Sequence, residues 1–172
     1  MAQQTVLGTI GKGKRGISTW GWVLRGAAAG AAGTTALNAV TYLDMTFRGR
    51  GTSSTPEQTV EALAEKVHVQ VPGDEETRSN RVQGLGPLTG LAAGIGAGVL
   101  AGLARAAGFR PMLLVGTLQS TLTVLLGSNG PMTALGITDP RTWSTTDWVS
   151  DVVPHAAYGV VTHATLAAFD RP

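Results

Sequence analysis

The residues best placed to do chemistry lie near the C-terminus of the chain. Asp147, Asp151 and His155 recur every four residues, so on a helix both carboxylates and the imidazole share one face. Tyr158 lies close to that face, and His163 follows His155 by eight residues, about 12 Å along a helix axis. Because imidazole titrates near neutral pH, Asp151, His155, Tyr158 and His163 together could relay protons.

A structural interpretation explains the same residues without any chemistry. Asp147 and Asp151 fall in the first turns of the expected helix, where the helix dipole stabilises negative charge. His155 then serves as a neutral, hydrogen-bonded histidine inside a helical bundle. We expect no metal, because His155 and His163 lie too far apart on one straight helix to bind the same ion, and we expect no other cofactor.

Two further polar groups lie inside long uncharged stretches. Asn38 stands between Thr34 and Thr41 at helical spacing, and Gln119 stands in a run rich in serine and threonine. An unsatisfied amide is costly in apolar surroundings, so Asn38 is expected to face other helices and to find a partner there. With the polar groups of the last helix, these side chains either line a hydrated path or form hydrogen bonds between helices, each worth about 0.6 kcal/mol.

The distribution of charge indicates what surrounds these residues. Charged residues make up 14 % of the 172-residue chain, the formal net charge is +2 and cysteine is absent. This balance argues against nucleic acid as a partner, and the lack of cysteine excludes disulfides and thiolate metal sites. Four stretches contain no Asp, Glu, Lys or Arg: residues 26–43, 82–104, 111–138 and 152–169. Each is close to the roughly 20 residues that a helix needs to cross a bilayer, so the sequence predicts four membrane spans.

The predicted fold class is therefore all-α, a four-span transmembrane helix bundle with a short amphipathic surface helix in the first loop. We expect spans at about 22–42, 85–107, 111–127 and 152–169, and the surface helix at about 56–68. Residues 1–19 are expected to form a flexible basic N-terminal tail ahead of a single transmembrane domain, 20–172. A charged turn is expected at 73–81, and the sequence SNGP at 128–131 is expected to end the third span.

Glycine recurs every fourth residue in the second predicted span. The ladder consists of Gly86, Gly90, Gly94, Gly98 and Gly102, and a shorter version in the first span consists of Gly26 and Gly30. Such a ladder leaves a groove without side chains, into which another helix can press its backbone. That helix is either the first span of the same chain or a helix of a second copy.

The sequence contains none of the common enzyme motifs: G-x-S-x-G, H-E-x-x-H, the P-loop and the dinucleotide fingerprint are all missing. We therefore expect a membrane protein that is not an enzyme. The first hypothesis is a homo-oligomer with channel character, or one that transports protons or a small solute. The second is a non-catalytic accessory or scaffold subunit of a larger membrane complex.

The expected surroundings follow from the same spans. The predicted partners are the lipid bilayer and either a second copy of the chain or another membrane protein. Of the 13 Lys and Arg residues, seven fall on the side of the termini and six on the other side. This distribution favours a multi-pass protein of the inner or plasma membrane with both termini in the cytoplasm.

Several short segments carry a resemblance to known proteins. They are residues 33–38 (GTTALN), 41–44 (TYLD), 54–60 (STPEQTV), 80–87 (NRVQGLGP) and 154–159 (PHAAYG). On these segments the chain resembles a group of small actinobacterial integral membrane proteins, which implies a four-span fold and no established activity. The layout of two hairpins of spans is also distantly similar to the YagU-type inner-membrane family, which implies a transport or stress role by analogy.

Overall fold

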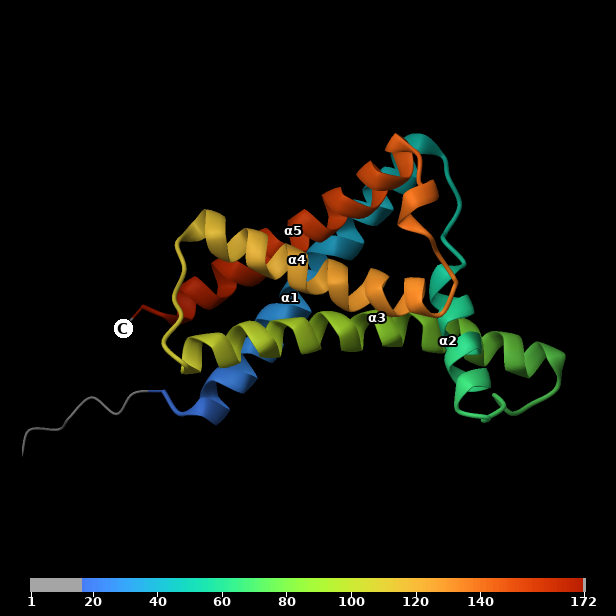
Figure 1. Cartoon of the computed structure of the whole chain (residues 1–172), viewed down its shortest axis with the longest axis horizontal. Coiled ribbons are helices and arrows are strands. Elements are labelled where there is room, and N and C mark those ends of the chain that lie inside the picture. Colours follow the sequence, from blue (N-terminus) through green and yellow to red (C-terminus); the bar gives the residue numbers. More distant parts are fainter. Residues whose placement is uncertain (1–16, 172) are drawn as a thin grey trace, which may run out of the picture.

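A computed structural model describes residues 17–171 of this protein, and its fold is built of helices (Figure 1). The helices are α1 (Thr19–Arg48), α2 (Thr55–Lys66), α3 (Glu75–Ala106), α4 (Leu113–Ala134), the short 3₁₀ helix η1 (Pro140–Thr142) and α5 (Thr145–Phe169). Residues 17–171 contain no strand, which confirms the all-α class. Most of the predicted N-terminal tail, residues 1–16, lies outside the described residues.

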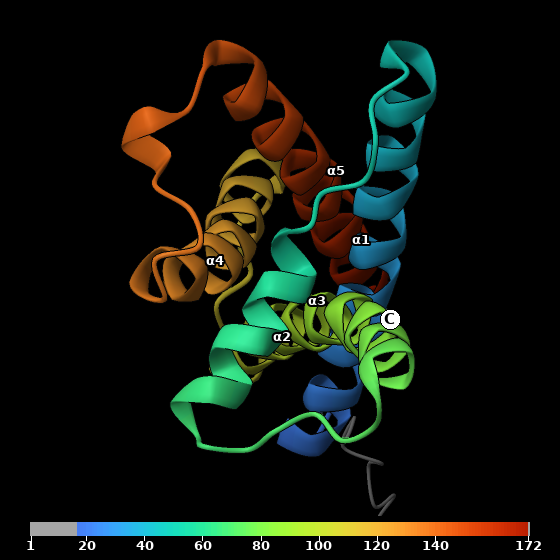
Figure 2. The same ribbon diagram turned by 90° about the vertical axis from the view of Figure 1, so that its right-hand side faces the viewer.

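The four long helices alternate in direction (Figure 1). The start of α1, the end of α3, the start of α4 and the end of α5 therefore meet at one end of the molecule, which we call the terminal end; the opposite end is the loop end. Helix α1 packs against α3 and α5, and α4 packs against α5 and α3. Helix α2 lies across α3 at the loop end (Figure 2).

Helix α3 begins ten residues earlier than the predicted span, so the expected charged turn at 73–81 is wrong. The side chain of Asp74 accepts a hydrogen bond of 2.9 Å from the backbone N–H of Thr77 and so caps the helix. Glu75 and Glu76 follow in the first turn, where the helix dipole stabilises negative charge. The charges that indicated a turn are thus the residues that start the helix.

Helix α4 continues through the predicted break at 128–131 and ends at Ala134. The Ser128 hydroxyl donates to the Val124 carbonyl at 2.9 Å, one turn back, and so supports the helix at this point. Pro131 removes one backbone donor, and the helix ends three residues later, at Ala134. The chain leaves the helix at Gly136, whose φ of 73° favours glycine.

The predicted short helix in the first loop is confirmed, and α5 begins just before Asp147. Helix α2 occupies Thr55–Lys66, against the predicted 56–68, and Val60 on its apolar side is buried. Helix α5 starts with a capping box, in which the Ser144 hydroxyl accepts from the Asp147 N–H and the Asp147 carboxylate accepts from the Ser144 N–H. The Asp147 pKa is lowered, because the Ser144 hydroxyl and backbone N–H both donate to its carboxylate.

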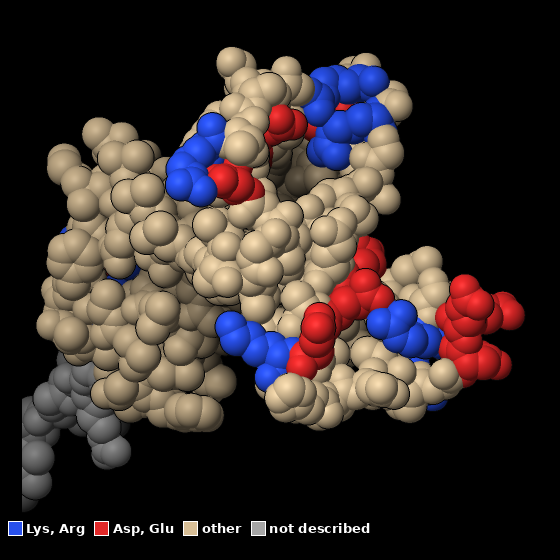
Figure 3. Space-filling view, turned by 45° about the vertical axis from the view of Figure 1, so that its right-hand side comes forward, with Lys and Arg blue, Asp and Glu red and all other residues tan. Residues whose placement is uncertain are grey.

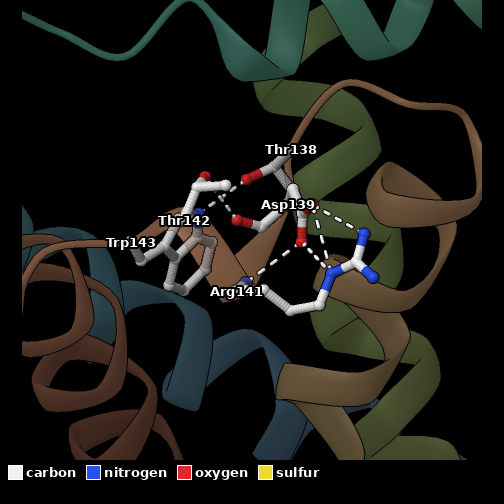
Figure 4. A network of polar contacts seen from close by, with 5 residues as sticks. All are labelled: Thr138, Asp139, Arg141, Thr142 and Trp143. Atoms are coloured by element: carbon white, nitrogen blue, oxygen red, sulfur yellow. Dashed lines mark hydrogen bonds and ion pairs between the residues drawn. The ribbon is translucent and has the colours of Figure 1, made fainter.

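The connection between α4 and α5 is held by its own side chains (Figure 4). The Asp139 carboxylate accepts from the backbone N–H of Arg141 at 3.0 Å and from the guanidinium at 2.8 Å. This ion pair lowers the pKa of Asp139 and raises the pKa of Arg141. The indole N–H of Trp143 donates to Thr138 at 2.8 Å, and its ring meets Trp148 edge to face at 4.9 Å between centroids.

One helix among residues 17–171, α3, is long and apolar enough to cross a membrane by length and composition. Helices α1, α4 and α5 do not meet this criterion, and each holds a strongly polar residue within its uncharged stretch: Asn38, Gln119 and His155. The coarse prediction of a helical protein with a membrane-spanning candidate therefore holds. The finer prediction of four spans is not established by the fold.

Candidate functional site

Polar side chains follow the inner face of α5 from the loop end to the terminal end. They form three groups. The α4–α5 polar cluster comprises Ser128, Asn129, Asp151 and His155; the central group comprises Tyr158 and Thr162; the arginine cluster comprises Arg25, Arg105, Arg110, His163 and Asp170, with Trp22 between its arginines.

The α4–α5 polar cluster joins the two helices at the loop end. The Asn129 amide donates to the Asp151 carboxylate at 2.9 Å. The Nδ1 atom of His155 lies 2.7 Å from the Asp151 backbone carbonyl, which can only accept, so Nδ1 carries the proton. Nε2 lies 3.3 Å from the Ser128 hydroxyl, whose own proton goes to the Val124 carbonyl. The Asp151 and His155 side chains lie near the loop end and expose 19 % and 12 % of their surfaces.

The central group closes the bundle where α1, α3 and α5 meet. Tyr158 is fully buried, and its hydroxyl donates to the Gly94 carbonyl of α3 at 2.6 Å. The Thr162 hydroxyl donates to the Ala29 carbonyl of α1 at 3.3 Å. A Cβ on Gly33 would collide with both Thr162 and Tyr158, so α1 has a glycine where the ring passes. Both hydroxyls thus hold neighbouring backbones.

The arginine cluster lies at the terminal end. Arg105 of α3 is 3 % exposed and donates to the Asp170 carboxylate at 3.1 Å, and Arg110 donates to the other oxygen of the same carboxylate at 3.0 Å. Arg105 also lies 3.4 Å from Nδ1 of His163. The His163 ring packs over Gly116 of α4 so closely that any side chain at that position would overlap it. One carboxylate therefore orients two guanidinium groups.

The predicted proton relay is only partly assembled. The structure brings Asp151 and His155 together, with 3.5 Å between the Asp151 carboxylate and Nδ1. Tyr158 and His163 are tied instead to Gly94 and Arg105, and the described residues show no hydrogen bond between either of them and His155. The inner face of α5 is therefore polar along its length without a continuous chain of proton carriers.

Asn38 does not lie where the sequence predicted. Its side chain is exposed, and among residues 17–171 it makes no hydrogen bond. The row Gly26, Gly30, Thr34 contacts α3. Helices α1 and α3 diverge toward the loop end (Figures 1 and 2), and Asn38, the next residue of this row, is exposed. Gln119 is half-buried on α4 and makes no contact with Asn38 or His155 in the described part of the chain.

The glycine ladder divides into three parts. Gly26 and Gly30 of α1 meet Gly94, Gly98 and Gly102 of α3 backbone to backbone. A Cβ on Gly30 would lie 3.0 Å from the Ile95 Cα, and a Cβ on Gly86 would lie 3.1 Å from Pro56 of α2. Gly90 faces open space. Most of the ladder therefore serves packing within one chain.

The sequence analysis did not predict one ion pair and one amide contact in these clusters. Arg105 and Asp170 mark the edges of uncharged stretches, which hid the fact that they pair with each other across 65 positions. Asn129 lies in the segment read as a loop, although its position four residues after Leu125 continues the helical row of α4. A search for opposite charges at the same end of the predicted helices would have found the first pair.

No protein-family model matches the chain, and neither a curated protein nor a solved structure shows significant similarity to it. The resemblance drawn from the short segments above therefore stays a prediction. Residues 17–171 also hold no group of three or more His, Asp or Glu side chains that could bind a metal ion. The function must be argued from the geometry of this chain.

Proposed function

We propose that this protein is a four-span integral membrane protein that acts as a non-catalytic subunit of a membrane assembly. Helices α1, α3, α4 and α5 form the spans, and α2 lies at the loop end. The observation that carries the membrane assignment is the outward apolar surface. Leu114, Leu118, Leu122 and Leu126 follow one side of α4 and are 67 %, 52 %, 56 % and 71 % exposed. A water-soluble helix places polar residues on such a face.

Helix α3 supports the same assignment. Its most apolar stretch is only 28 % buried within the chain. The central helix of a water-soluble bundle would have most of this surface covered by its neighbours. An apolar helix that is exposed along most of its length is stable when lipid covers it.

The charges are arranged as a membrane would require. In Figure 3 the charged side chains gather in two groups at the loop end, and a broad surface beside them carries almost none. Every Asp and Glu except Asp170 belongs to the loop end. The terminal end carries Arg25, Arg105, Arg110 and Arg171, so we assign it to the cytoplasm and the protein to the inner or plasma membrane.

Asn38 supports an assembly. It lies within the uncharged stretch of α1, about 9 Å along the axis from Asp44, and its amide faces outward without a partner among the described residues. An amide in hydrocarbon is stabilised when it bonds to another helix, and such bonds are worth about 0.6 kcal/mol on average. We therefore infer that Asn38 contacts a second copy of the chain or a companion membrane protein.

Transport of protons or of a small solute is the second candidate, and the α4–α5 polar cluster favours it. Nδ1 of His155 there lies 3.5 Å from the Asp151 carboxylate, and an imidazole beside a carboxylate is suited to proton exchange. The central group weighs against a path through the chain, because Tyr158 and Thr162 are buried and engaged with backbone carbonyls. Proton flux into liposomes by the native protein, lost in His155→Ala, would establish transport in place of the first proposal.

The test of the proposal measures membrane integration and mass. Full-length protein should stay in the membrane pellet after an alkaline carbonate wash. Native mass spectrometry in mild detergent should show an oligomer or a companion protein, and Asn38→Leu should reduce it. The matched control is Thr35→Val on the same helix, because the exposed Thr35 hydroxyl is already bonded to the Ala31 carbonyl. Release by carbonate would refute the spans, and a monomer in the native protein would refute the assembly.

A further inference from the structure

The arginine cluster carries more positive charge than it neutralises. Arg105 and Arg110 share the single carboxylate of Asp170. Arg25 makes no ion pair among residues 17–171, and His163 is the remaining titratable neighbour of Arg105. At the loop end Arg48 and Arg50 also share one carboxylate, that of Asp44, whereas Arg78 and Arg141 pair with Glu61 and Asp139. The arginine cluster differs in its third guanidinium, that of Arg25, which has no carboxylate partner among residues 17–171. The terminal end therefore has an excess of positive charge that could bind an anion from outside the described chain.

Aromatic rings hold the third arginine in place. The guanidinium carbon of Arg25 lies 5.5 Å from the centre of the Trp22 ring and 5.7 Å from that of Phe169. The guanidinium of Arg110 lies 5.6 Å from the same Trp22 ring. Cation–π contacts orient both groups without neutralising their charge, because an aromatic ring carries no net charge. The buried Trp22 thus contacts two guanidinium groups at once.

We propose that the arginine cluster binds the phosphate of an anionic phospholipid head group in the leaflet at the terminal end. This inference rests on the proposed membrane function. A guanidinium offers a planar fork of donors that matches two phosphate oxygens, and two such groups held by one indole offer two forks. The cluster lies where the spans end, which is the depth of lipid phosphates in a bilayer.

Asp170 has a positioning role in this site. Its two oxygens take one bond each from Arg105 and Arg110, so both groups are oriented before a ligand arrives. Its negative charge repels a phosphate, but Arg25, Arg105 and Arg110 together outweigh it. Arg110 and Arg25 are also the accessible members, because Arg110 exposes 52 % of its side chain and Arg25 is half-buried, whereas Arg105 is enclosed.

The test compares an anionic and a zwitterionic phospholipid with the same acyl chains. Delipidated full-length protein in mild detergent is titrated with phosphatidylglycerol or with phosphatidylcholine of the same acyl chains, and bound lipid is counted by native mass spectrometry. We expect tighter binding of phosphatidylglycerol. Arg25→Gln and Arg110→Gln should each weaken it about fivefold, the value for one arginine near an anionic lipid surface. Arg78→Gln at the loop end is the matched control and should change nothing.

Three results would overturn the proposal. They are equal affinity for the two lipids, an equal loss in Arg78→Gln, and displacement of phosphatidylglycerol by millimolar inorganic phosphate, which would assign the site to free phosphate. Arg25→Lys keeps the charge and should bind between the native protein and Arg25→Gln, so the proposal can still be tested if the glutamine variant fails to fold. The carbonate wash separates this outcome from failure of the membrane proposal, because it reports integration whatever the lipid preference.

Discussion

Replacing glycine by alanine at two positions of α3 tests whether the glycine ladder serves packing within one chain. Gly98 lies at the crossing with α1, where a new Cβ would be 2.5 Å from the Gly30 Cα and 2.6 Å from its nitrogen. Gly90 lies two turns earlier on the same ladder and has nothing within 4 Å of a new Cβ. Both substitutions therefore add one methyl group to α3. At Gly98 it would overlap the backbone of α1, and at Gly90 it would point into open space.

The expected free energies have opposite signs. Alanine favours the helix over glycine by about 1 kcal/mol at both positions. At Gly98 the methyl group meets backbone atoms, which cannot rotate away, so α1 and α3 must separate at a cost near the upper part of the 1–3 kcal/mol range for overpacking, about 3 kcal/mol. Gly98→Ala should thus destabilise the protein by about 2 kcal/mol and Gly90→Ala should stabilise it by about 1 kcal/mol, a difference of about 3 kcal/mol.

The assay is reversible unfolding of each variant in mixed micelles, followed by far-ultraviolet circular dichroism, with oligomer mass measured in parallel. Equal free energies of unfolding for Gly98→Ala and the native protein would refute the close approach of α1 and α3. Destabilisation of Gly90→Ala together with a loss of oligomer would show that the open part of the ladder is an interface between copies. That result would refute the assignment of the ladder to one chain.

Three further outcomes are expected. Tyr158→Phe removes the hydrogen bond from the buried hydroxyl to the Gly94 carbonyl, which keeps its donor within α3, and should lower the free energy of unfolding by about 0.5–1.5 kcal/mol; an unchanged value would show that this hydrogen bond contributes no net stability. Arg105→Gln should destabilise more than Arg110→Gln, because Arg105 is buried and Arg110 is half exposed; equal losses in the same unfolding assay would contradict the difference in burial. The Asp147 pKa is lowered by its hydrogen bonds from Ser144, so its stabilisation of α5 is complete above the ordinary Asp pKa of about 3.9 and is lost as the pH falls through the lowered value. Amide exchange at residues 144–148 should therefore accelerate in that acid range. Constant protection would exclude the capping box as a stabiliser.

The sequence predicts helices well here because the relevant signals are local. The Ser144–Asp147 capping box and the Thr55–Pro56 start of α2 depend on residues within one turn. The two errors of helix boundary have the same origin. Charges at 74–76 and the sequence SNGP at 128–131 are each compatible with a turn and with a helix. Both segments are helical in the structure, where Asp74 caps α3 and Asn129 of α4 donates to Asp151 of α5.

The candidate site shows the limit of the same reasoning. Spacing places Asp151 and His155 on one face, and the structure brings them together, because residues four apart on a helix are neighbours whatever surrounds them. Spacing also places Asn38 on the row of Gly26 and Gly30, but it does not tell how far along that row the partner helix extends. Asn38 is exposed for this reason.

What the sequence alone determined is therefore the presence of the helices and the residues that share a face of each. The tertiary structure decided which faces meet. It pairs Arg105 with Asp170 across 65 positions and joins Tyr158 to Gly94, and it leaves Gly90 open on a ladder whose other members are in contact. The physical reason is that the period of a helix fixes directions around its axis, whereas the crossing point of two helices depends on the close packing of all their side chains at once.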